Sequence, residues 1–167
     1  MNIRVGFGFD IHQLVAGRAL WLGGVHIPHP KGALGHSDAD VLIHAICDAI
    51  LGAANLRDIG YHFSNNDPKY AGIDSKILLQ EVMVLLRSHG YELGNIDASL
   101  TLENPKINPH IPAMVQVLAQ AMQVAPDQVS IKATTNETLG YIGREEGVEA
   151  QAVALIYKKD TTILQNP

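Results

Sequence analysis

The sequence has little cysteine, no long apolar run and no excess of basic residues. Its single cysteine, Cys47, excludes an internal disulfide and is expected to pack as a small apolar residue. No uninterrupted apolar run reaches the roughly 20 residues that span a bilayer, and no secretory signal is visible at the start. The formal charge of -5 argues against binding to nucleic acid or to a membrane surface. These absences predict a soluble cytoplasmic protein.

What is present is typical of one folded domain. The 167 residues are 47% hydrophobic and 17% charged, enough for one well-filled core. We find no internal repeat or linker, so a single domain is expected over 1–158. Residues 159–167 are expected to form a loose tail.

Apolar strand patterns alternate with amphipathic helix patterns along the chain. Strands are expected at 3–10, 96–103, 129–133 and 148–157. Helices are expected at 37–54, 75–89 and 111–123. This alternation predicts an α+β (or α/β) layer architecture in which helices cover a sheet.

Short signals predict the connections. Gly23-Gly24 permits the positive φ of a tight turn, which predicts a hairpin between 20–22 and 25–27. Ser37 and Asp40 match a capping box, with Ser37 at the N-cap of the first helix. The long polar stretch 58–74 is either a mobile surface loop or a functional one.

Asp10, His12 and His44 suggest one divalent-metal site. Asp10 and His12 are two apart in a strand, so their side chains share a face, and His44 lies on the following helix. One carboxylate and two imidazoles suit zinc, with a fourth position left for substrate or water. Asp40 or Asp48, one helical turn from His44, could accept the free N–H of that ligand histidine. The alternative is an ordinary solvated helix face.

Two further clusters are suited to phosphate. His36 and Ser37 precede a helix, whose N-terminal N–H groups attract anions, although Ser37 could simply cap and His36 lie on the surface. The segment 132–137 carries Thr134, Thr135 and Glu137 at a strand end. Hydroxyls with Arg144 could contact phosphate while Glu137 binds magnesium, unless the threonines are only strand composition.

Taken together, these clusters resemble the 2-C-methyl-D-erythritol 2,4-cyclodiphosphate synthase family of the non-mevalonate route to isoprenoids. The stretches that carry the resemblance extend over about 3–157. They are Gly8-Phe9-Asp10-Ile11-His12, Gly17-Arg18, Leu22-Gly23-Gly24-Val25, Gly35-His36-Ser37-Asp38-Ala39-Asp40-Val41, His44-Ala45-Ile46, Asp58-Ile59-Gly60, Pro105-Lys106, Pro109-His110-Ile111, Lys132-Ala133-Thr134-Thr135 and Gly143-Arg144.

The resemblance implies a homotrimer of subunits that each carry a small four-stranded mixed sheet with helices on one face. The sheets would surround a central axis, and the active sites would lie between subunits. The implied enzyme is a metal-dependent phosphorus–oxygen lyase. It converts 4-diphosphocytidyl-2-C-methyl-D-erythritol 2-phosphate to 2-C-methyl-D-erythritol 2,4-cyclodiphosphate and CMP, because the substrate's 2-phosphate attacks its own β-phosphorus.

The resemblance also implies a role for individual residues. Zn²⁺ would be held by Asp10, His12 and His44, and Mg²⁺ or Mn²⁺ bridging the substrate phosphates would be held by Glu137. His36 and Thr135 match the positions that stabilise the transition state. The implied substrate contacts are Asp10, Ile11, His12, His36, Ser37, Asp58, Ile59, Gly60, Phe63, Ser64, Asn65, Asn66, Asp67, Leu102, Glu103, Asn104, Pro105, Lys106, Ile107, Asn108, Thr134, Thr135, Asn136, Glu137, Tyr141 and Arg144.

Some positions depart from the family pattern. Ser64-Asn65-Asn66-Asp67 replaces a common Pro-Asp-Thr-Asp, and Leu102-Glu103 replaces a common Ala-Gln. Some members bind isoprenoid diphosphates in the trimer's central cavity, near positions that match Phe9, Arg144 and Gln151, and that property stays open here. Two rival hypotheses are a zinc phosphoesterase that hydrolyses with metal-activated water and a non-catalytic isoprenoid-diphosphate sensor.

Overall fold

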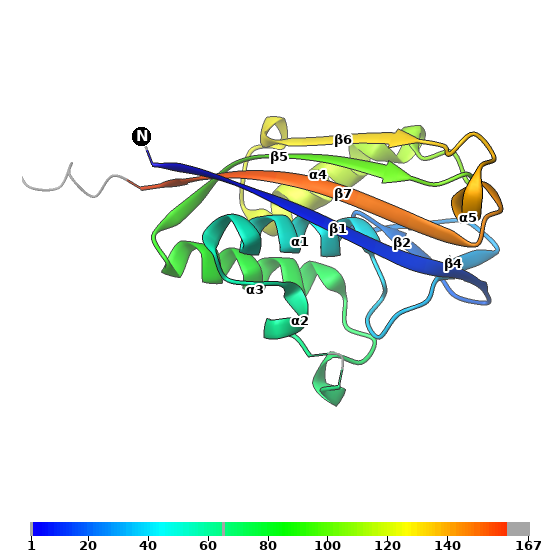
Figure 1. The fold of residues 1–167 in the computed structure, drawn as a ribbon, viewed down its shortest axis with the longest axis horizontal. Coiled ribbons are helices and arrows are strands. Elements are labelled where there is room, and N and C mark those ends of the chain that lie inside the picture. The colour runs from blue at the N-terminus through cyan, green and yellow to red at the C-terminus, as the bar shows by residue number, and fades with distance from the viewer. Residues whose placement is uncertain (1, 65, 160–167) are drawn as a thin grey trace, which may run out of the picture.

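A mixed sheet is the framework of the chain in its computed structural model (Figure 1), which describes residues 2–64 and 66–159. Within those residues the main sheet has five strands, in the order β4-β1-β7-β5-β6. Their bounds are β4 Lys31–Ala33, β1 Ile3–Ala16, β7 Gly147–Lys158, β5 Tyr91–Thr101 and β6 Val129–Thr134. β5 and β6 are parallel, and every other neighbouring pair is antiparallel. This arrangement confirms an α+β fold with a mixed sheet.

The expectation of four strands was wrong. β1 continues past Asp10 to Ala16, and its far end pairs with β4, where Leu14 lies opposite Ala33. β4 is only three residues long and contains Gly32, so neither alternation nor β-branched residues mark it in the sequence. The pairing with β1 creates this strand.

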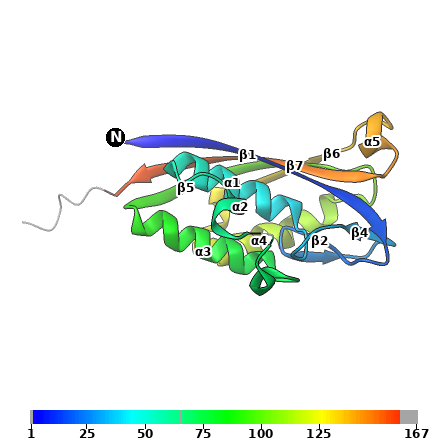
Figure 2. The same cartoon turned by 60° about the horizontal axis from the view of Figure 1, so that its bottom comes forward.

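The long helices cover one face of the sheet, as expected (Figure 2). α1 (Val41–Ala54) packs on β1 and β7, α4 (Ile111–Met122) packs on β6, and α3 (Ser75–Ser88) packs against both helices. The short helices are α2 Ile59–His62, α5 Gly140–Gly143, η1 Pro68–Tyr70, η2 Asn108–His110 and η3 Pro126–Gln128. α2 and η1 give the predicted polar loop a defined course between α1 and α3. Cys47 is buried in α1, as predicted.

Two glycines of β1 bring α1 unusually close to the sheet. A Cβ at Gly6 would lie 2.0 Å from the carbonyl oxygen of Ala49, and a Cβ at Gly8 would lie 2.0 Å from that of Ala45. Both distances are far below van der Waals contact, so neither position has room for a side chain. The buried alanines Ala150, Ala152 and Ala154 of β7 continue this closely approached surface. Beyond Gly8, the side chains on the same face of β1 therefore lie close to α1.

The start of α1 is held by Asp40, not by Ser37 as expected. The fully buried Asp40 side chain accepts from Ile43 N at 3.1 Å, and also from Gly23 N at 2.9 Å and Gly24 N at 2.6 Å. Ser37, three residues before this N-cap, instead accepts from Ala39 N through its Oγ. The predicted hairpin β2 (Leu20–Leu22) and β3 (Val25–Ile27) turns through Gly23 and Gly24, both at positive φ. A single carboxylate thus joins this hairpin to the helix that carries His44.

The other face of β1 and β7 exposes apolar side chains. On β1, Val5 is 66% exposed and Phe7 62%, and Phe9 and Ile11 follow on the same face. Val153 of β7 pairs with Phe7 and is also exposed. A row of large apolar side chains along one sheet face is unusual for a surface that meets only water.

β7 ends at Lys158, and residues 160–167 of the expected tail lie outside the described residues. Within the part of the chain that is described, no helix has the length and apolar character needed to cross a membrane.

Candidate metal centre and its pocket

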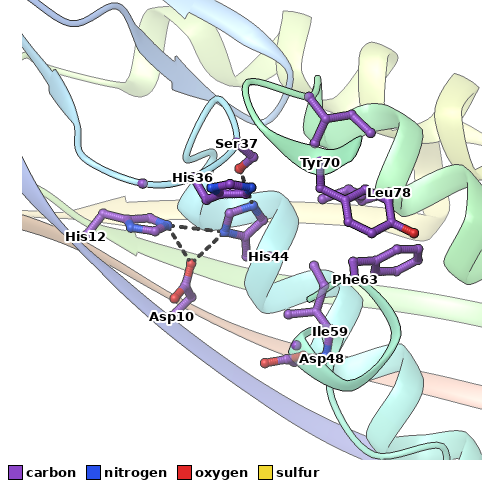
Figure 3. A pocket seen from close by; sticks show the side chains of 13 residues that line it. Asp10, His12, His36, Ser37, His44, Asp48, Ile59, Phe63, Tyr70 and Leu78 are labelled. Carbon is purple, nitrogen blue, oxygen red and sulfur yellow. Dashed lines mark hydrogen bonds and ion pairs between the residues drawn. The ribbon is translucent and has the colours of Figure 1, made fainter. Parts of the chain in front are cut away.

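Asp10, His12 and His44 converge, as the sequence predicted (Figure 3). Asp10 Oδ2 lies 3.1 Å from His12 Nε2 and 2.9 Å from His44 Nδ1, and the two imidazole nitrogens are 3.2 Å apart. Ligands around a tetrahedral zinc ion with bonds of 2.0–2.1 Å are about 3.3 Å apart. The three atoms therefore form a triangle close to the size of one face of such a site.

The backbone explains this convergence. Asp10 and His12 alternate with Ile11 along β1, so they face α1 while the Ile11 side chain lies on the opposite, exposed face. Gly8 lets α1 approach at Ala45, the residue after His44. The sheet and the helix together place the side chain of His44 opposite those of Asp10 and His12.

The charges of the three groups are strongly coupled. Burial tends to raise the pKa of Asp10, but its hydrogen bonds and charge interactions with His12 and His44 outweigh burial and hold that pKa well below the ordinary value. Burial tends to lower the pKa of His44, and the hydrogen bond and charge of Asp10 outweigh it and raise that pKa. In the metal-free protein, Asp10 therefore favours a positive charge beside it.

The partner of the second His44 nitrogen differs from the expectation. Neither Asp40 nor Asp48 accepts from His44: Asp40 caps α1, and Asp48 Oδ1 accepts from Ile59 N at 2.7 Å. His44 Nε2 instead lies 3.0 Å from Ser75 Oγ, the first residue of α3. The prediction from helical spacing was wrong, because the partner of His44 Nε2 comes from a different helix, α3.

A pocket of about 180 Å³ opens beside the triad. Figure 3 shows His36 and Ser37 beside His44 on its polar side, and Ile59, Phe63, Tyr70 and Leu78 on its apolar side. Such a pocket can hold an anionic group at the polar end and a carbon skeleton at the other. Of the predicted residues, it gathers Asp10, His12, His36, Ser37, His44, Ile59, Gly60 and Phe63.

Other predicted loop residues shape the pocket wall. Asp58 caps α2 by accepting from Tyr61 N, and Asp67 caps η1 by accepting from Lys69 N. His36 Nε2 lies 3.3 Å from the carbonyl oxygen of Asp67. Ser64 Oγ accepts from Asn66 N. Asn65, also predicted to contact substrate, lies outside the described residues.

Several of the predicted substrate-contact residues gather in a second hollow. Its lining residues include Leu102, Pro105, Lys106, Ile107, Asn108, Thr134 and Thr135. Glu103 Oε2 accepts from Asn136 N at 3.2 Å and from Thr138 N at 3.4 Å, which ties the two walls together. Asn104 donates to Glu145. The carboxylate at position 103 thus has a structural partner within the chain.

The remaining predicted residues lie on the segment that follows β6. Thr135 Oγ1 donates to Glu137 at 3.0 Å, Tyr141 Oη donates to Glu149, and Arg144 forms an ion pair with Glu146. Glu137 lies outside the Asp10–His12–His44 group, and its metal role stays a prediction. In Figures 1 and 2, β6 and α5 lie well away from α2. The second hollow and the pocket beside the triad share no lining residue.

A family model and close relatives match this architecture. Residues 3–157 match the model of the YgbB family. The chain belongs to the YgbB family. A 2-C-methyl-D-erythritol 2,4-cyclodiphosphate synthase of Cytophaga hutchinsonii is 63% identical, over 95% of this chain and 99% of the relative. The family match and this relative confirm the resemblance to the synthase family that the motifs indicated.

Solved structures of such synthases agree. A 2C-methyl-D-erythritol-2,4-cyclodiphosphate synthase in a CDP-bound form has a TM-score of 0.84 and 40% identity, over 92% of this chain and 99% of that one. IspF of Plasmodium falciparum in complex with CDP also has a TM-score of 0.84, with 33% identity, over 95% of this chain and 98% of that one. Both relatives bind a cytidine diphosphate.

Sequence reasoning missed several residues of the YgbB-family pocket. Tyr70 and Ile73 line it from the polar loop, and Leu78 lines it from α3. Asp48 also lines it, and burial, aided by repulsion from Asp58 and Asp10, raises its pKa although Ile59 N donates to it. The spacing of one helical turn from His44 had marked Asp48 only as a possible hydrogen-bond acceptor of that histidine, and not as a pocket residue. The apolar residues carried no signal, because core residues have the same composition.

Proposed function

We propose that the protein converts 4-diphosphocytidyl-2-C-methyl-D-erythritol 2-phosphate to 2-C-methyl-D-erythritol 2,4-cyclodiphosphate, with release of CMP, in isoprenoid precursor synthesis. The observation that carries this proposal is the Asp10–His12–His44 triangle at the mouth of a half-apolar pocket. The synthase relatives and their CDP complexes supply the substrate class. A cytoplasmic location remains part of the proposal.

The residues at the triangle fit zinc. The spacing of three nitrogen and oxygen ligands suits a tetrahedral ion and leaves one position toward the pocket. Zinc bound there would act as a Lewis acid and template for a phosphate group. Glu137 has an exposed carboxylate and would suit Mg²⁺ or Mn²⁺, which are usually held by few protein groups and by substrate phosphates.

The reaction needs positioning more than a protein nucleophile. An oxygen of the substrate's 2-phosphate forms a bond to the β-phosphorus, and the bond between that phosphorus and the bridging oxygen breaks. CMP leaves with the electron pair, and no water is consumed. Ile59, Phe63 and Leu78 would pack on the methylerythritol, while His36 and Thr135 would donate to phosphate oxygens.

A homotrimer would complete the active site. The triad pocket and the second hollow share no lining residue within one chain. The exposed apolar face of Val5, Phe7 and Phe9 offers a surface for neighbouring subunits around a sheet-lined axis. We infer that the hollow of one subunit, with Thr134 and Lys106, meets the triad pocket of the next. Binding of an isoprenoid diphosphate near Phe9, Arg144 and Gln151 stays a separate, open hypothesis.

The test is turnover of the cytidine diphosphate substrate with Zn²⁺ and Mg²⁺, followed by phosphorus NMR in water enriched in heavy oxygen. The cyclase gives equal amounts of CMP and a cyclic diphosphate with two coupled resonances and no solvent oxygen. A linear bisphosphate containing solvent oxygen would instead identify a hydrolase, and binding without CMP release would identify a sensor.

A matched pair of histidine variants locates the activity. His44→Ala removes one corner of the triangle and should abolish CMP release. His26→Ala removes an exposed histidine on β3 and should leave turnover unchanged. Equal activity of the two variants would reject the assignment of the triangle as the reaction centre.

A further inference from the structure

A chain of buried and half-buried polar groups leads away from the triad. His44 Nε2 lies 3.0 Å from Ser75 Oγ, and Ser75 Oγ donates to Asp38 Oδ1 at 2.5 Å. Asp38 Oδ2 also accepts from Ser75 N at 2.9 Å. Ser75 is fully buried at the first turn of α3, whereas His44 belongs to α1. Two segments that are distant in sequence, residues 38–44 and the start of α3, therefore converge behind one candidate ligand.

The hydrogens in this chain can be assigned by counting donors. A serine hydroxyl has one hydrogen, and that of Ser75 is directed to the Asp38 carboxylate. Only lone pairs of Ser75 Oγ remain for His44, so His44 Nε2 must be the donor. Ser37 Oγ, 3.2 Å from the same nitrogen, can accept from it as well and can turn its own hydrogen to Ser75 Oγ at 3.5 Å.

This assignment determines whether Nδ1 of His44 carries a hydrogen or a free lone pair. In neutral His44, the hydrogen on Nε2 leaves a lone pair on Nδ1. That lone pair faces Asp10 Oδ2 at 2.9 Å and His12 Nε2 at 3.2 Å. His44 Nδ1 and Asp10 Oδ2 are then two acceptors that face each other, and a cation between them satisfies both. His12 Nε2 can join them as a third ligand atom when the hydrogen of His12 is on its Nδ1.

We propose that Asp38 and Ser75 are positioning residues that hold His44 as the Nε2–H tautomer, so that its Nδ1 is the metal-binding atom. The proposal deepens the metal site of the proposed function and rests on it. Asp38 receives both the N–H and the O–H of Ser75, which fixes the serine rotamer, and Ser75 then fixes the imidazole ring. Neither residue lines the pocket beside the triad.

The test compares zinc affinity in two serine-to-alanine variants of α3 by competition with a chelator. Ser75→Ala removes the acceptor of His44 and should weaken zinc binding by roughly 10- to 100-fold, the usual effect of removing a ligand's hydrogen-bond partner. Ser88→Ala, at the other end of the same helix, removes a hydroxyl that donates to Leu85 O and should bind zinc like the parent protein.

A second measurement does not depend on the folding of a variant. Nitrogen NMR of the zinc-loaded, histidine-labelled parent protein should show a slowly exchanging hydrogen on His44 Nε2 and zinc on Nδ1. A hydrogen on Nδ1, or zinc affinity in Ser75→Ala equal to that in Ser88→Ala, would overturn the relay and leave the metal site intact. A parent protein that binds no zinc would overturn the relay and the proposed function together.

Discussion

The close approach of β1 and α1 at Gly8 gives the sharpest prediction. A Cβ at Gly8 would lie 2.0 Å from Ala45 O and 2.7 Å from Ala49 N, both of them backbone atoms of α1. Ordinary contact begins near 3.4 Å, so Gly8→Ala requires the helix to move by about 1.4 Å. His44 directly precedes Ala45, and the triad is held together by distances of 2.9–3.2 Å. The substitution therefore acts on stability and on metal binding together.

Two magnitudes follow for Gly8→Ala. Overpacking of this kind costs about 1–3 kcal/mol, which lowers the Tm of a chain this long by roughly 2–12 °C. Zinc affinity should fall at least about tenfold, because a site displaced by about 1 Å no longer fits its ion. Thermal unfolding of the metal-free protein and chelator competition, at one protein concentration, measure the two effects.

Two other glycines provide matched controls. Gly6→Ala produces the same 2.0 Å approach to Ala49 O, about one helical turn from His44, and should lower Tm similarly but weaken zinc binding less. Gly52 lies in α1 with its nearest neighbour 3.9 Å from an added Cβ, so Gly52→Ala should stabilise by about 0.5–1 kcal/mol. The reasoning is refuted if Gly8→Ala and Gly52→Ala have the same Tm and the same zinc affinity.

Three further predictions concern charge, assembly and the second hollow. Asp10 raises the pKa of His44 above its ordinary 6.5, so the metal-free protein gains stability from this pair below about pH 6.5 and loses it as pH rises through the folded pKa. Its Tm should fall more between about pH 6 and pH 9 than that of His44→Gln, and parallel curves would contradict this. Phe7→Asp on the exposed sheet face should convert a trimer to smaller species by light scattering, whereas an unchanged mass would exclude this face as the interface. Glu103→Ala should raise KM for the substrate while Glu103→Gln, which keeps an acceptor for Asn136 N and Thr138 N, should raise it less; equal KM values would argue against that role.

Local sequence patterns determined much of this protein. Alternation along β1 puts Asp10 and His12 on one face, and the apolar period of α1 fixes where His44 projects. The Gly23-Gly24 turn and the three long helices follow from equally short-range signals. These features depend on residues a few positions apart, so they are readable without the fold.

The tertiary structure alone decided which distant groups meet. Ser75 and Asp38 are 37 residues apart, and neither carries a signal that connects it to His44. Asp40 caps α1 in place of Ser37 because the carboxylate also receives two N–H groups of the hairpin. β4 exists only through its pairing with the end of β1. Hydrogen bonds between remote segments are set by packing, and packing leaves no periodic trace in the sequence.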